Sequence, residues 1–316
     1  MVLRVLLISL ISVQVFAQTS FVEDGKSSLF SHKTQLPEKR RDSVFWLPVL
    51  SYFAPGALQY MNGQIGAGLV YSGIGVTGLA TALGAASEVN NRINNNEDLN
   101  DFDSRDSAVR RYVWGMKTYD LAGSLSLYHG FRTALQFRQK EGEFEFLPKE
   151  AETSDELMLA PFNFSNLSRL TTIIPLALGV GLMAYSGAND DYDTRNLTAG
   201  DIAFSGGISY NAGVGEEAMF RGWMFPLFVE SFGSSFWGNM AQSTIFAAAH
   251  LSSDNRFPMP QFLAGYYFAW LSQRNNWTLQ ESIFIHTWWD VIVFTASFTQ
   301  GDKKASIYVP LYQTQF

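Results

Sequence analysis

The sequence predicts an all-α, polytopic membrane protein with about six to eight transmembrane helices, and three observations predict this class. Hydrophobic residues make up 47% of the 316 residues and charged residues only 16%, against roughly 25% charged in soluble domains. Aromatic residues reach 15% and there are 26 glycines, as in membrane helices, where glycine and interfacial Trp and Tyr are enriched. Apolar runs also recur along the chain between polar turns. The mean hydropathy near zero indicates that sizeable polar loops are also present.

The N-terminus predicts a secretory signal peptide over residues 1–17. Arg4 supplies a positive charge, Val5–Phe16 is mostly apolar, and Ala17 is the small residue favoured before cleavage. Residues 18–44 are polar and charged and form an extramembrane lead-in. We therefore expect a multi-pass protein of a membrane, the bacterial inner (cytoplasmic) membrane.

Residues 45–150 are predicted as an N-terminal membrane hairpin region with polar loops. Phe45–Tyr60 is apolar but broken by two prolines, which fits a re-entrant or interfacial segment as well as a span. Ile65–Ala86 carries no charge and exceeds the roughly 20 residues that a spanning helix needs. Its glycines provide small faces for close helix packing. Glu88–Arg111 is rich in Asn and Asp and is predicted to be a solvated loop.

The end of this region contains a second candidate helix and a charged linker. Tyr112–Phe131 could form a helix, although Lys117 and Asp120 leave its position relative to the membrane open. Arg132–Glu156 is highly charged and predicts an extramembrane linker. This linker is the best candidate for a boundary before a second domain, which we place at 151–316.

The second domain consists mainly of apolar runs that are separated by short polar turns. The runs are Leu170–Tyr185, Ala218–Phe232, Phe236–Leu251, Pro260–Ser272 and Ile283–Phe298. Three of them contain or adjoin ionisable residues, which cost several kcal/mol each to bury unless they are paired. Only four histidines occur in the chain, and two of them occupy such positions. This concentration indicates a functional site.

The spacing of these residues places them on shared helix faces. Glu217 and Arg221 are four apart, so they can pair on one face, while Glu216 points about 100° away and is free to face a cavity. His250 follows Phe246 by four residues in the second run. In the last run His286 and Asp290 repeat this spacing. Three helices thus each present a polar patch toward what could be one site.

Together these patches resemble a known family. The phrase EEAMFR fits the pattern EExxxR, Phe246 with His250 fits FxxxH, and His286 with Asp290 fits HxxxN/D, in this order. The chain is similar here to the CPBP family of intramembrane proteases (the CAAX-protease and bacteriocin-processing, Abi-type family). The resemblance covers roughly Ala199–Phe298, so the predicted CPBP-like domain is 151–316 with its motifs within 199–298.

The resemblance implies a role for each motif residue. Glu216 would be the general base that activates a water molecule, and His250 would help to hold this water. Glu217 and Arg221 would be structural or orienting. His286 and Asp290 would stabilise the oxyanion of the tetrahedral intermediate. Because an aspartate donates a hydrogen bond only when protonated, we favour a second role for Asp290, which is to orient His286 by accepting its N–H.

A metal is the open question at this site. Two histidines and two glutamates suit zinc, and if a metal is used its ligands would be Glu216, His250 and His286. The HExxH spacing of zinc proteases and the Glu-x-x-His spacing of di-iron bundles are both missing from the motifs. We therefore expect catalysis without a cofactor, with zinc as the alternative.

The function that follows is an intramembrane endopeptidase whose partners are the lipid bilayer and a membrane-anchored peptide or protein substrate. The signal peptide is of bacterial type, which makes a prenylated CAAX substrate a poor fit. The alternatives are a catalytically silent membrane scaffold, a bacteriocin-immunity-type protein, or a zinc-dependent protease. A transporter would need two inverted halves, which the sequence does not show. The net charge of −7 excludes nucleic acid as a partner, and the lack of cysteine excludes disulfides and a thiol nucleophile.

Overall fold

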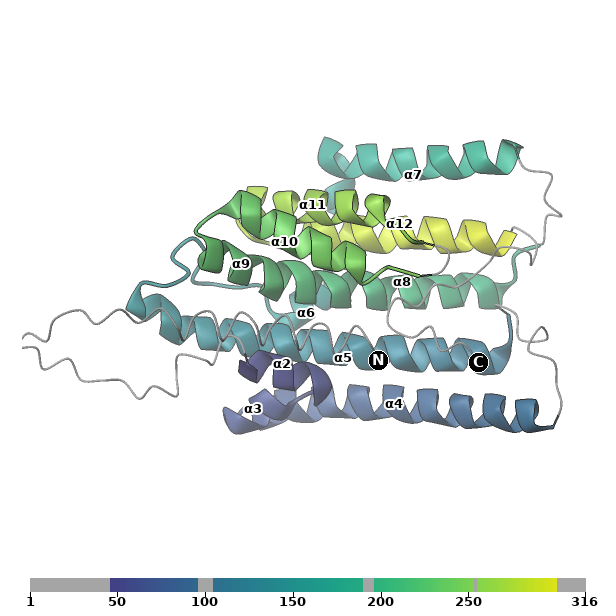
Figure 1. The fold of residues 1–316 in the computed structure, drawn as a ribbon, viewed down its shortest axis with the longest axis horizontal. Helices are drawn as coiled ribbons and strands as arrows, with labels where there is room; N and C mark the ends of the chain where they lie inside the picture. The colour runs from purple at the N-terminus through teal and green to yellow at the C-terminus, as the bar shows by residue number, and fades with distance from the viewer. Residues whose placement is uncertain (1–45, 96–104, 190–195, 253–254, 300–316) are drawn as a thin grey trace, which may run out of the picture.

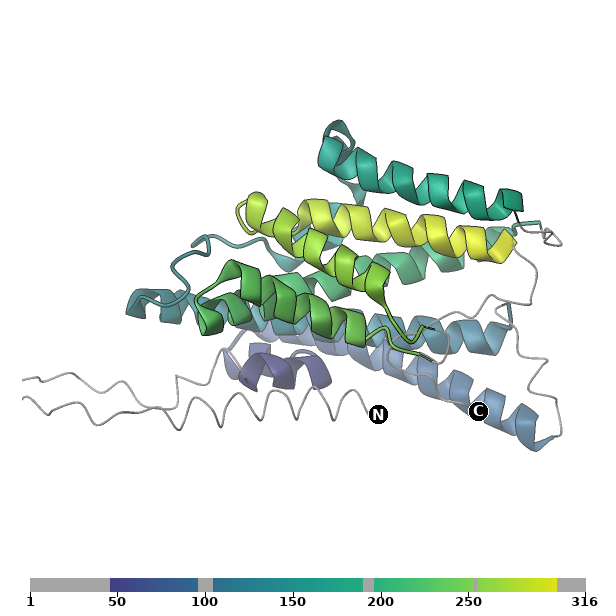
Figure 2. The same cartoon turned by 45° about the horizontal axis from the view of Figure 1, so that its top comes forward.

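The computed structural model describes residues 46–95, 105–189, 196–252 and 255–299. The predicted signal peptide and lead-in lie outside these residues. The described residues form helices and turns, with no strand among them, which confirms the all-α prediction. Figure 1 shows the long helices lying side by side in the order α4, α5, α8, α12 and α7, and each contacts the next. Figure 2 shows the shorter α9, α10 and α11 gathered toward one end of this bundle.

The bounds of the elements place each predicted run. The α-helices are α2 (Trp46–Phe53), α3 (Ala57–Met61), α4 (Ile65–Asn94), α5 (Ser107–Arg138), α6 (Ser154–Leu159), α7 (Leu170–Asn189), α8 (Ala199–Met219), α9 (Phe225–Phe232), α10 (Ser235–Ala248), α11 (Met259–Arg274) and α12 (Gln280–Thr299). Short 3₁₀ turns are η3 (Gln139–Glu141), η4 (Ala160–Phe162) and η5 (Phe164–Ser168), and η6 (Phe220–Met224) is a π-helical turn.

The first apolar run is broken at the second of its two prolines, as the sequence indicates. Two short helices, α2 and α3, are joined at Pro55-Gly56. Gly56 has φ +93°, a left-handed conformation that favours glycine, and a Cβ there would lie 2.5 Å from the carbonyl oxygen of Gly68. The chain therefore turns sharply at this point and packs against the start of α4.

Helix α4 begins at Ile65 as predicted and packs along α5 through glycines. A Cβ on Gly78 would lie 2.7 Å from the carbonyl oxygen of Gly115, and a Cβ on Gly115 would lie 2.6 Å from the backbone nitrogen of Ala82. Such small residues let the two helix backbones approach closely. Within the described ranges, α4 is the helix that is long and apolar enough to cross a membrane.

The prediction of a loop over Glu88–Arg111 is wrong at both ends. Helix α4 continues to Asn94, and α5 already begins at Ser107. The helix ends are held by polar contacts that hydrophobic periodicity does not report. Arg92 Nη1 lies 2.7 Å from Asp106 Oδ2, and the Asp106 side chain accepts the amides of the first turn of α5.

The charged segment predicted as a linker begins as a helix and packs against the bundle. Helix α5 continues to Arg138, and beyond it Phe144 and Leu147 are buried in one hydrophobic cluster with Met219 and Trp223. The segment therefore connects the N-terminal helices to the helix that carries the first motif.

That first motif lies on a longer rod than the predicted run Ala218–Phe232. Helix α8 starts at Ala199 and leads through the π-helical turn η6 into α9 without a loop. Thr198 caps α8 together with Asp201 in a reciprocal capping box. A π-helical turn inside an α-helical rod is often found at a functional site.

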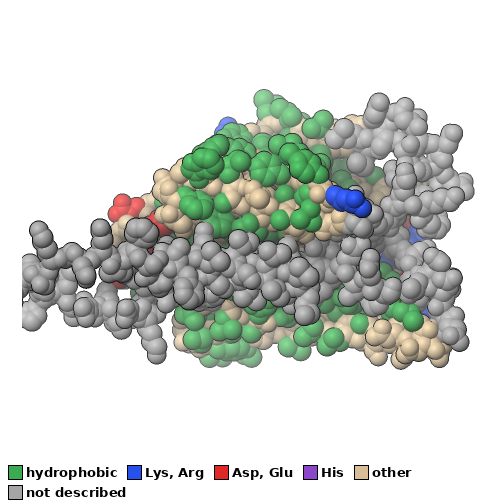
Figure 3. All heavy atoms as spheres, in the orientation of Figure 1, with side chains coloured by type: hydrophobic (Ala, Val, Ile, Leu, Met, Phe, Trp, Pro, Cys, Tyr) green, Lys and Arg blue, Asp and Glu red, His purple; other side chains and the backbone are tan. Residues whose placement is uncertain are grey.

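The surface of the bundle is apolar over much of its length. Figure 3 shows hydrophobic side chains spread over the helices of the visible face. Strongly exposed examples lie on three helices: Leu69, Val76 and Leu83 on α4, Leu170, Ile174 and Leu178 on α7, and Leu263 and Trp270 on α11. The predicted count of six to eight spans stays a prediction, because α4 alone among the described helices has the length and hydropathy of a span. Other long helices also bury polar side chains, such as Ser205 and Ser209 on α8.

Candidate active site

The two adjacent glutamates at the end of α8 face different surroundings, as their spacing predicts. Glu217 is fully buried, and its Oε1 lies 2.8 Å from Nη1 of Arg221 on the π-helical turn. Glu216 points away from this pair toward α5, α12 and the turn after α10. One glutamate is thereby bound to an arginine and the other remains available for chemistry.

Arg221 is held by aromatic rings as well as by this carboxylate. Its guanidinium carbon lies 4.3 Å from the ring centroid of Phe246 and 5.3 Å from that of Phe268. Cation–π contacts of this kind gain strength where water is excluded. The Phe268 ring also stacks on the His286 ring, with centroids 5.3 Å apart and planes at 21°. The Phe268 ring therefore contacts both the arginine and a motif histidine.

His286 on α12 is oriented by Glu217. Its Nδ1 lies 2.8 Å from Glu217 Oε1, and because a carboxylate accepts, Nδ1 carries the proton and donates. The other ring nitrogen, Nε2, lies 3.8 Å from Glu216 Oε2. The imidazole therefore directs Nε2 toward Glu216.

The hydrogen bond from His286 to Asp290 that we favoured from the sequence is not formed, and the orienting role of Asp290 stays a prediction. Its Oδ2 lies 3.7 Å from Nε2 of His286, beyond hydrogen-bond distance. The Nδ1–H of the ring is accepted by Glu217. Asp290 instead lies beside the same Nε2 as Glu216, one helical turn beyond His286 on α12.

His250 reaches the site from a turn and not from a helix, which corrects the expectation of three helices. Helix α10 ends at Ala248. The turn is fixed because His250 Nδ1 lies 2.8 Å from the carbonyl oxygen of Phe246, and because the two rings pack with centroids 4.7 Å apart. Its Nε2 lies 3.9 Å from Glu216 Oε2.

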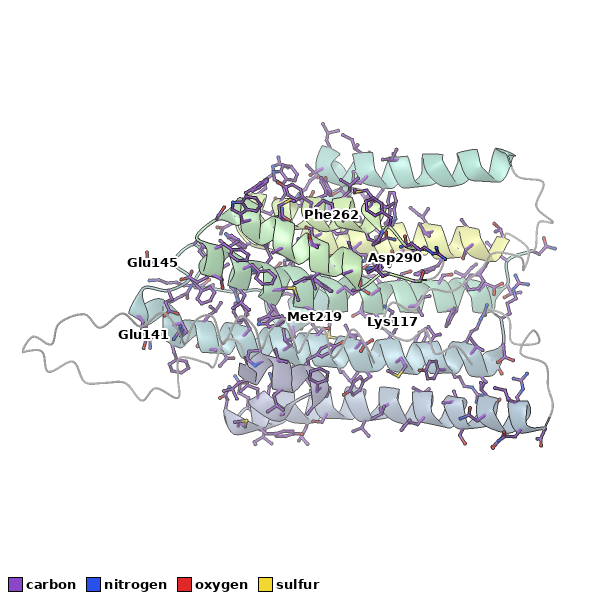
Figure 4. The ribbon with its side chains drawn as sticks, viewed as in Figure 1. Lys117, Glu141, Glu145, Met219, Phe262 and Asp290 are labelled. Carbon is purple, nitrogen blue, oxygen red and sulfur yellow. The ribbon has the colours of Figure 1, made fainter. Side chains whose placement is uncertain are left out.

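A residue that the motifs do not include completes the group. Lys117 on α5 places its Nζ 2.9 Å from Glu216 Oε1. Figure 4 shows Lys117 and Asp290 at a similar level along the bundle, on α5 and α12. The sequence contains a signal for this residue, since a lysine within an apolar run is a candidate functional residue by default. Its partner could not be read from the sequence, because Glu216 is 99 positions away.

Close helix packing holds the site together. A Cβ on Gly213 would lie 2.2 Å from Thr287 Oγ1 and 2.9 Å from its backbone nitrogen. Residue 213 is one turn before Glu217, and residue 287 is next to His286. Glycine at this position therefore lets α8 and α12 approach closely enough for the hydrogen bond between Glu217 and His286.

A carboxylate from the charged segment fixes the start of α12. Glu152 Oε2 accepts a hydrogen bond of 2.6 Å from the backbone nitrogen of Leu279, directly before α12. Burial raises the pKa of Glu152, while the backbone amides of Leu279 and Gln280 act in the opposite direction. Glu152 lies between α5 and α6, so this contact ties the connecting segment to the helix that carries His286.

The surroundings of the sequence-predicted metal ligands include a cation. Among the residues that the structure describes, no group of three or more His, Asp and Glu side chains could hold a metal. The sequence-predicted ligands Glu216, His250 and His286 surround a space that also faces a cation, since the Lys117 ammonium lies 2.9 Å from Glu216 Oε1. A divalent cation on this carboxylate would be repelled by that ammonium.

Fold and site define an all-α protein in which a glutamate paired with a lysine is grouped with two histidines, an aspartate and a buried Glu–Arg pair. Residues 199–292 match the family model for Rce1-like proteins, described as type II CAAX prenyl endopeptidase Rce1-like. This match confirms the resemblance that the motifs indicate, and this part of the chain is consistent with the CPBP family of intramembrane proteases. The comparisons with curated proteins and with solved structures found no match.

The matched family is one of membrane proteases, which supports both a membrane location and proteolysis for this chain. All six residues that the sequence analysis singled out lie within the matched segment. Lys117 lies outside it, on a helix that the family model does not cover.

Proposed function

We propose that the protein is a metal-free intramembrane endopeptidase in which Glu216 activates a water molecule to cleave a membrane-anchored peptide or protein. The observation that carries the proposal is the convergence of two imidazoles on one carboxylate oxygen. Glu216 Oε2 lies 3.9 Å from His250 Nε2 and 3.8 Å from His286 Nε2. These distances are too long for direct hydrogen bonds and suit groups that bind one water between them.

The proposed reaction begins with proton transfer from this water to Glu216. His250 helps to hold the water, whose oxygen attacks the carbonyl carbon of the scissile peptide bond. The negative charge that develops on the carbonyl oxygen is stabilised by the Nε2–H of His286. When the C–N bond breaks, Glu216 returns its proton to the leaving amine.

The charges of the site support a donor at His286 Nε2. Glu216, Glu217 and Asp290 are three carboxylates, and Lys117 with Arg221 supplies two cations. A third positive charge, on the His286 imidazole, would bring the net charge of these side chains to zero. An apolar interior favours such a low net charge. A doubly protonated ring donates from Nδ1 to Glu217 and from Nε2 to the developing oxyanion.

The apolar surface supports access from the bilayer. Exposed large hydrophobic side chains on α4, α7 and α11 are suited to contact lipid. A multi-pass arrangement would place the site at membrane depth, where a membrane-anchored substrate can reach it. The name of the matched family makes prenylated CAAX peptides one substrate class to test, next to transmembrane peptides without a lipid group.

The test is cleavage of both peptide classes by the purified protein in detergent. Glu216→Gln should abolish cleavage while the helical content and the unfolding temperature stay close to those of the wild type. A matched control is Glu88→Gln. Glu88 lies on α4 and forms an exposed ion pair with Arg111 on α5. EDTA and 1,10-phenanthroline should leave the rate unchanged. Retained cleavage in Glu216→Gln would refute the proposal, and inhibition by the chelators would favour the zinc-dependent alternative.

The scaffold alternative predicts a different result in cells. A binding protein without proteolysis would still complement a deletion strain when it carries Glu216→Ala or His250→Ala. Loss of complementation by these variants at normal protein levels would support the peptidase.

A further inference from the structure

The ion pair between α5 and α8 is the strongest feature that the motifs leave unexplained. Lys117 Nζ lies 2.9 Å from Glu216 Oε1, and the two side chains are 13% and 16% exposed. A lysine in such surroundings is costly unless a partner compensates its charge. Lys117 belongs to the N-terminal region, which the motifs and the family match do not cover.

The pair leaves only one oxygen of Glu216 available. Oε1 is bound by the ammonium, and Oε2 is the atom that faces His250 and His286. A glutamate has three side-chain torsions, so without the lysine its carboxylate could rotate away from the histidines. The contact therefore selects the orientation that the proposed water activation needs.

Helix α5 is held firmly enough to serve this purpose. One turn before Lys117, the Trp114 ring packs on Gly207 of α8. A Cβ added to Gly207 would lie 2.0 Å from the nearest atom of this ring. Directly after Lys117, Thr118 Oγ1 accepts a hydrogen bond of 3.4 Å from Asn211 Nδ2. Contacts on both sides of the lysine thus fix the position from which it reaches Glu216.

We infer that Lys117 is a positioning residue of the active site, which binds one oxygen of Glu216 and thereby directs the other toward the water held by the two histidines. The inference rests on the proposed function. It assigns to the N-terminal region a part in the chemistry, because α5 supplies the ammonium group that binds Oε1 of Glu216.

The chain contains no cysteine, which allows a direct test. Lys117→Cys introduces a single thiol that can be modified in two ways. The aminoethyl methanethiosulfonate reagent adds a short chain with an ammonium group, and the propyl reagent adds a neutral chain of similar length. Ser107→Cys, at an exposed position at the start of the same helix, is the matched control.

We expect Lys117→Cys to lower kcat about 100-fold, the order of loss that follows a displacement of about 1 Å in a catalytic group. KM should stay within about threefold, because Lys117 contacts the base and not the substrate. The aminoethyl adduct should restore most of kcat, the propyl adduct should restore none, and a reducing agent should reverse the rescue. Lys117→Arg should keep more activity than Lys117→Met. Ser107→Cys should respond to neither reagent.

Two results would overturn the inference. Full activity in Lys117→Cys would show that Glu216 needs no partner, and equal rescue by both adducts would show that only the filled volume matters. These outcomes are separable from failure of the proposed function. If Glu216→Gln abolishes cleavage while Lys117→Cys does not lower kcat, the peptidase stands and the positioning role falls. If the wild type cleaves neither peptide class, both fall.

Discussion

His286 Nδ1 lies 2.8 Å from Oε1 of Glu217, so the second glutamate of the first motif orients the histidine of the third. The same oxygen lies 2.8 Å from Arg221 Nη1. Because one buried oxygen serves both groups, the Glu–Arg pair and the histidine form a single unit. The pair is therefore structural and orienting at once, and its loss should affect both stability and turnover.

The first prediction concerns this unit. Glu217→Gln leaves the Arg221 guanidinium buried without a countercharge, and breaking a buried ion pair in this way costs roughly 3–5 kcal/mol. We expect a clear fall in the unfolding temperature in detergent and a loss of kcat, because His286 loses its charged acceptor. Thermal unfolding and single-turnover cleavage measure the two effects.

Double substitution provides the control for Glu217→Gln. Glu217→Gln with Arg221→Met removes both charges and should regain part of the lost stability, while cleavage stays low. Glu88→Gln, which breaks the exposed pair with Arg111, should change stability by less than about 1 kcal/mol. Simple additivity in the double variant would contradict a coupled pair.

The second prediction separates two roles for Asp290. Its carboxylate makes no hydrogen bond to the His286 ring, whose Nδ1 is held by Glu217. Asp290→Asn should therefore keep the ring in place and offer an amide donor to the oxyanion. We expect Asp290→Asn to retain at least the wild-type kcat. Asp290→Leu offers neither an amide donor nor a countercharge to His286, so it should be less active than Asp290→Asn. If Asp290→Asn were as inactive as Asp290→Leu, a charged aspartate would be required for orientation.

Most of the helical fold could be predicted, because an apolar run that must be buried or meet lipid is visible in the sequence. The start of α4 at Ile65 was predicted to the residue. The ends were missed where caps and ion pairs decide them, as at Asp106 before α5. Periodicity reports which face is apolar, but it does not report where polar contacts end a helix.

In the site too, contacts within one helix could be predicted, while contacts between distant helices could not. The pair of Glu217 with Arg221 follows from i,i+4 spacing on one helical rod. The orientation of His286 and the partner of Lys117 depend on contacts between helices that are far apart in the chain. These contacts arise only when the helices pack, so one sequence indicates the residues but not their pairing.

The third prediction tests the close approach of α8 and α12. In Gly213→Ala the new Cβ would lie 2.2 Å from Thr287 Oγ1 and 3.0 Å from the Thr287 Cα. Because backbone atoms are involved, the helices must separate, which would stretch the contact between Glu217 and His286. We expect lower stability, in the range of about 1–3 kcal/mol for overpacking, and a strong loss of cleavage.

The matched control for this variant lies on the same helix. Gly206→Ala places a Cβ where no atom lies within 4 Å, so it should be neutral or stabilise by about 0.4–1 kcal/mol through the unfolded state. A loss of stability in Gly213→Ala together with a gain in Gly206→Ala would support the packing argument. Equal effects would mean that helix propensity, not the contact with Thr287, determines the outcome.

The last prediction concerns the pH dependence of folding at the start of α5. Burial raises the pKa of Asp106, but hydrogen bonds from Arg92 and from the amides of Val109 and Ala108 outweigh it, so the pKa is lowered. The folded protein therefore binds fewer protons at this group than the unfolded chain does. Its contribution to stability is complete above the ordinary range of an aspartate and is lost as the pH falls through the lowered pKa.

Asp106→Ala should accordingly cost about 1 kcal/mol at neutral pH, the usual value of an N-cap, and the difference from the wild type should shrink in acid. Asp106→Asn keeps an oxygen that accepts the amides of the first turn, so it should keep most of the stability, and its cap should not depend on pH. Unfolding temperatures of the three proteins between neutral and acid pH measure this. A gap between wild type and Asp106→Ala that does not change with pH would mean that the carboxylate charge contributes nothing to the cap.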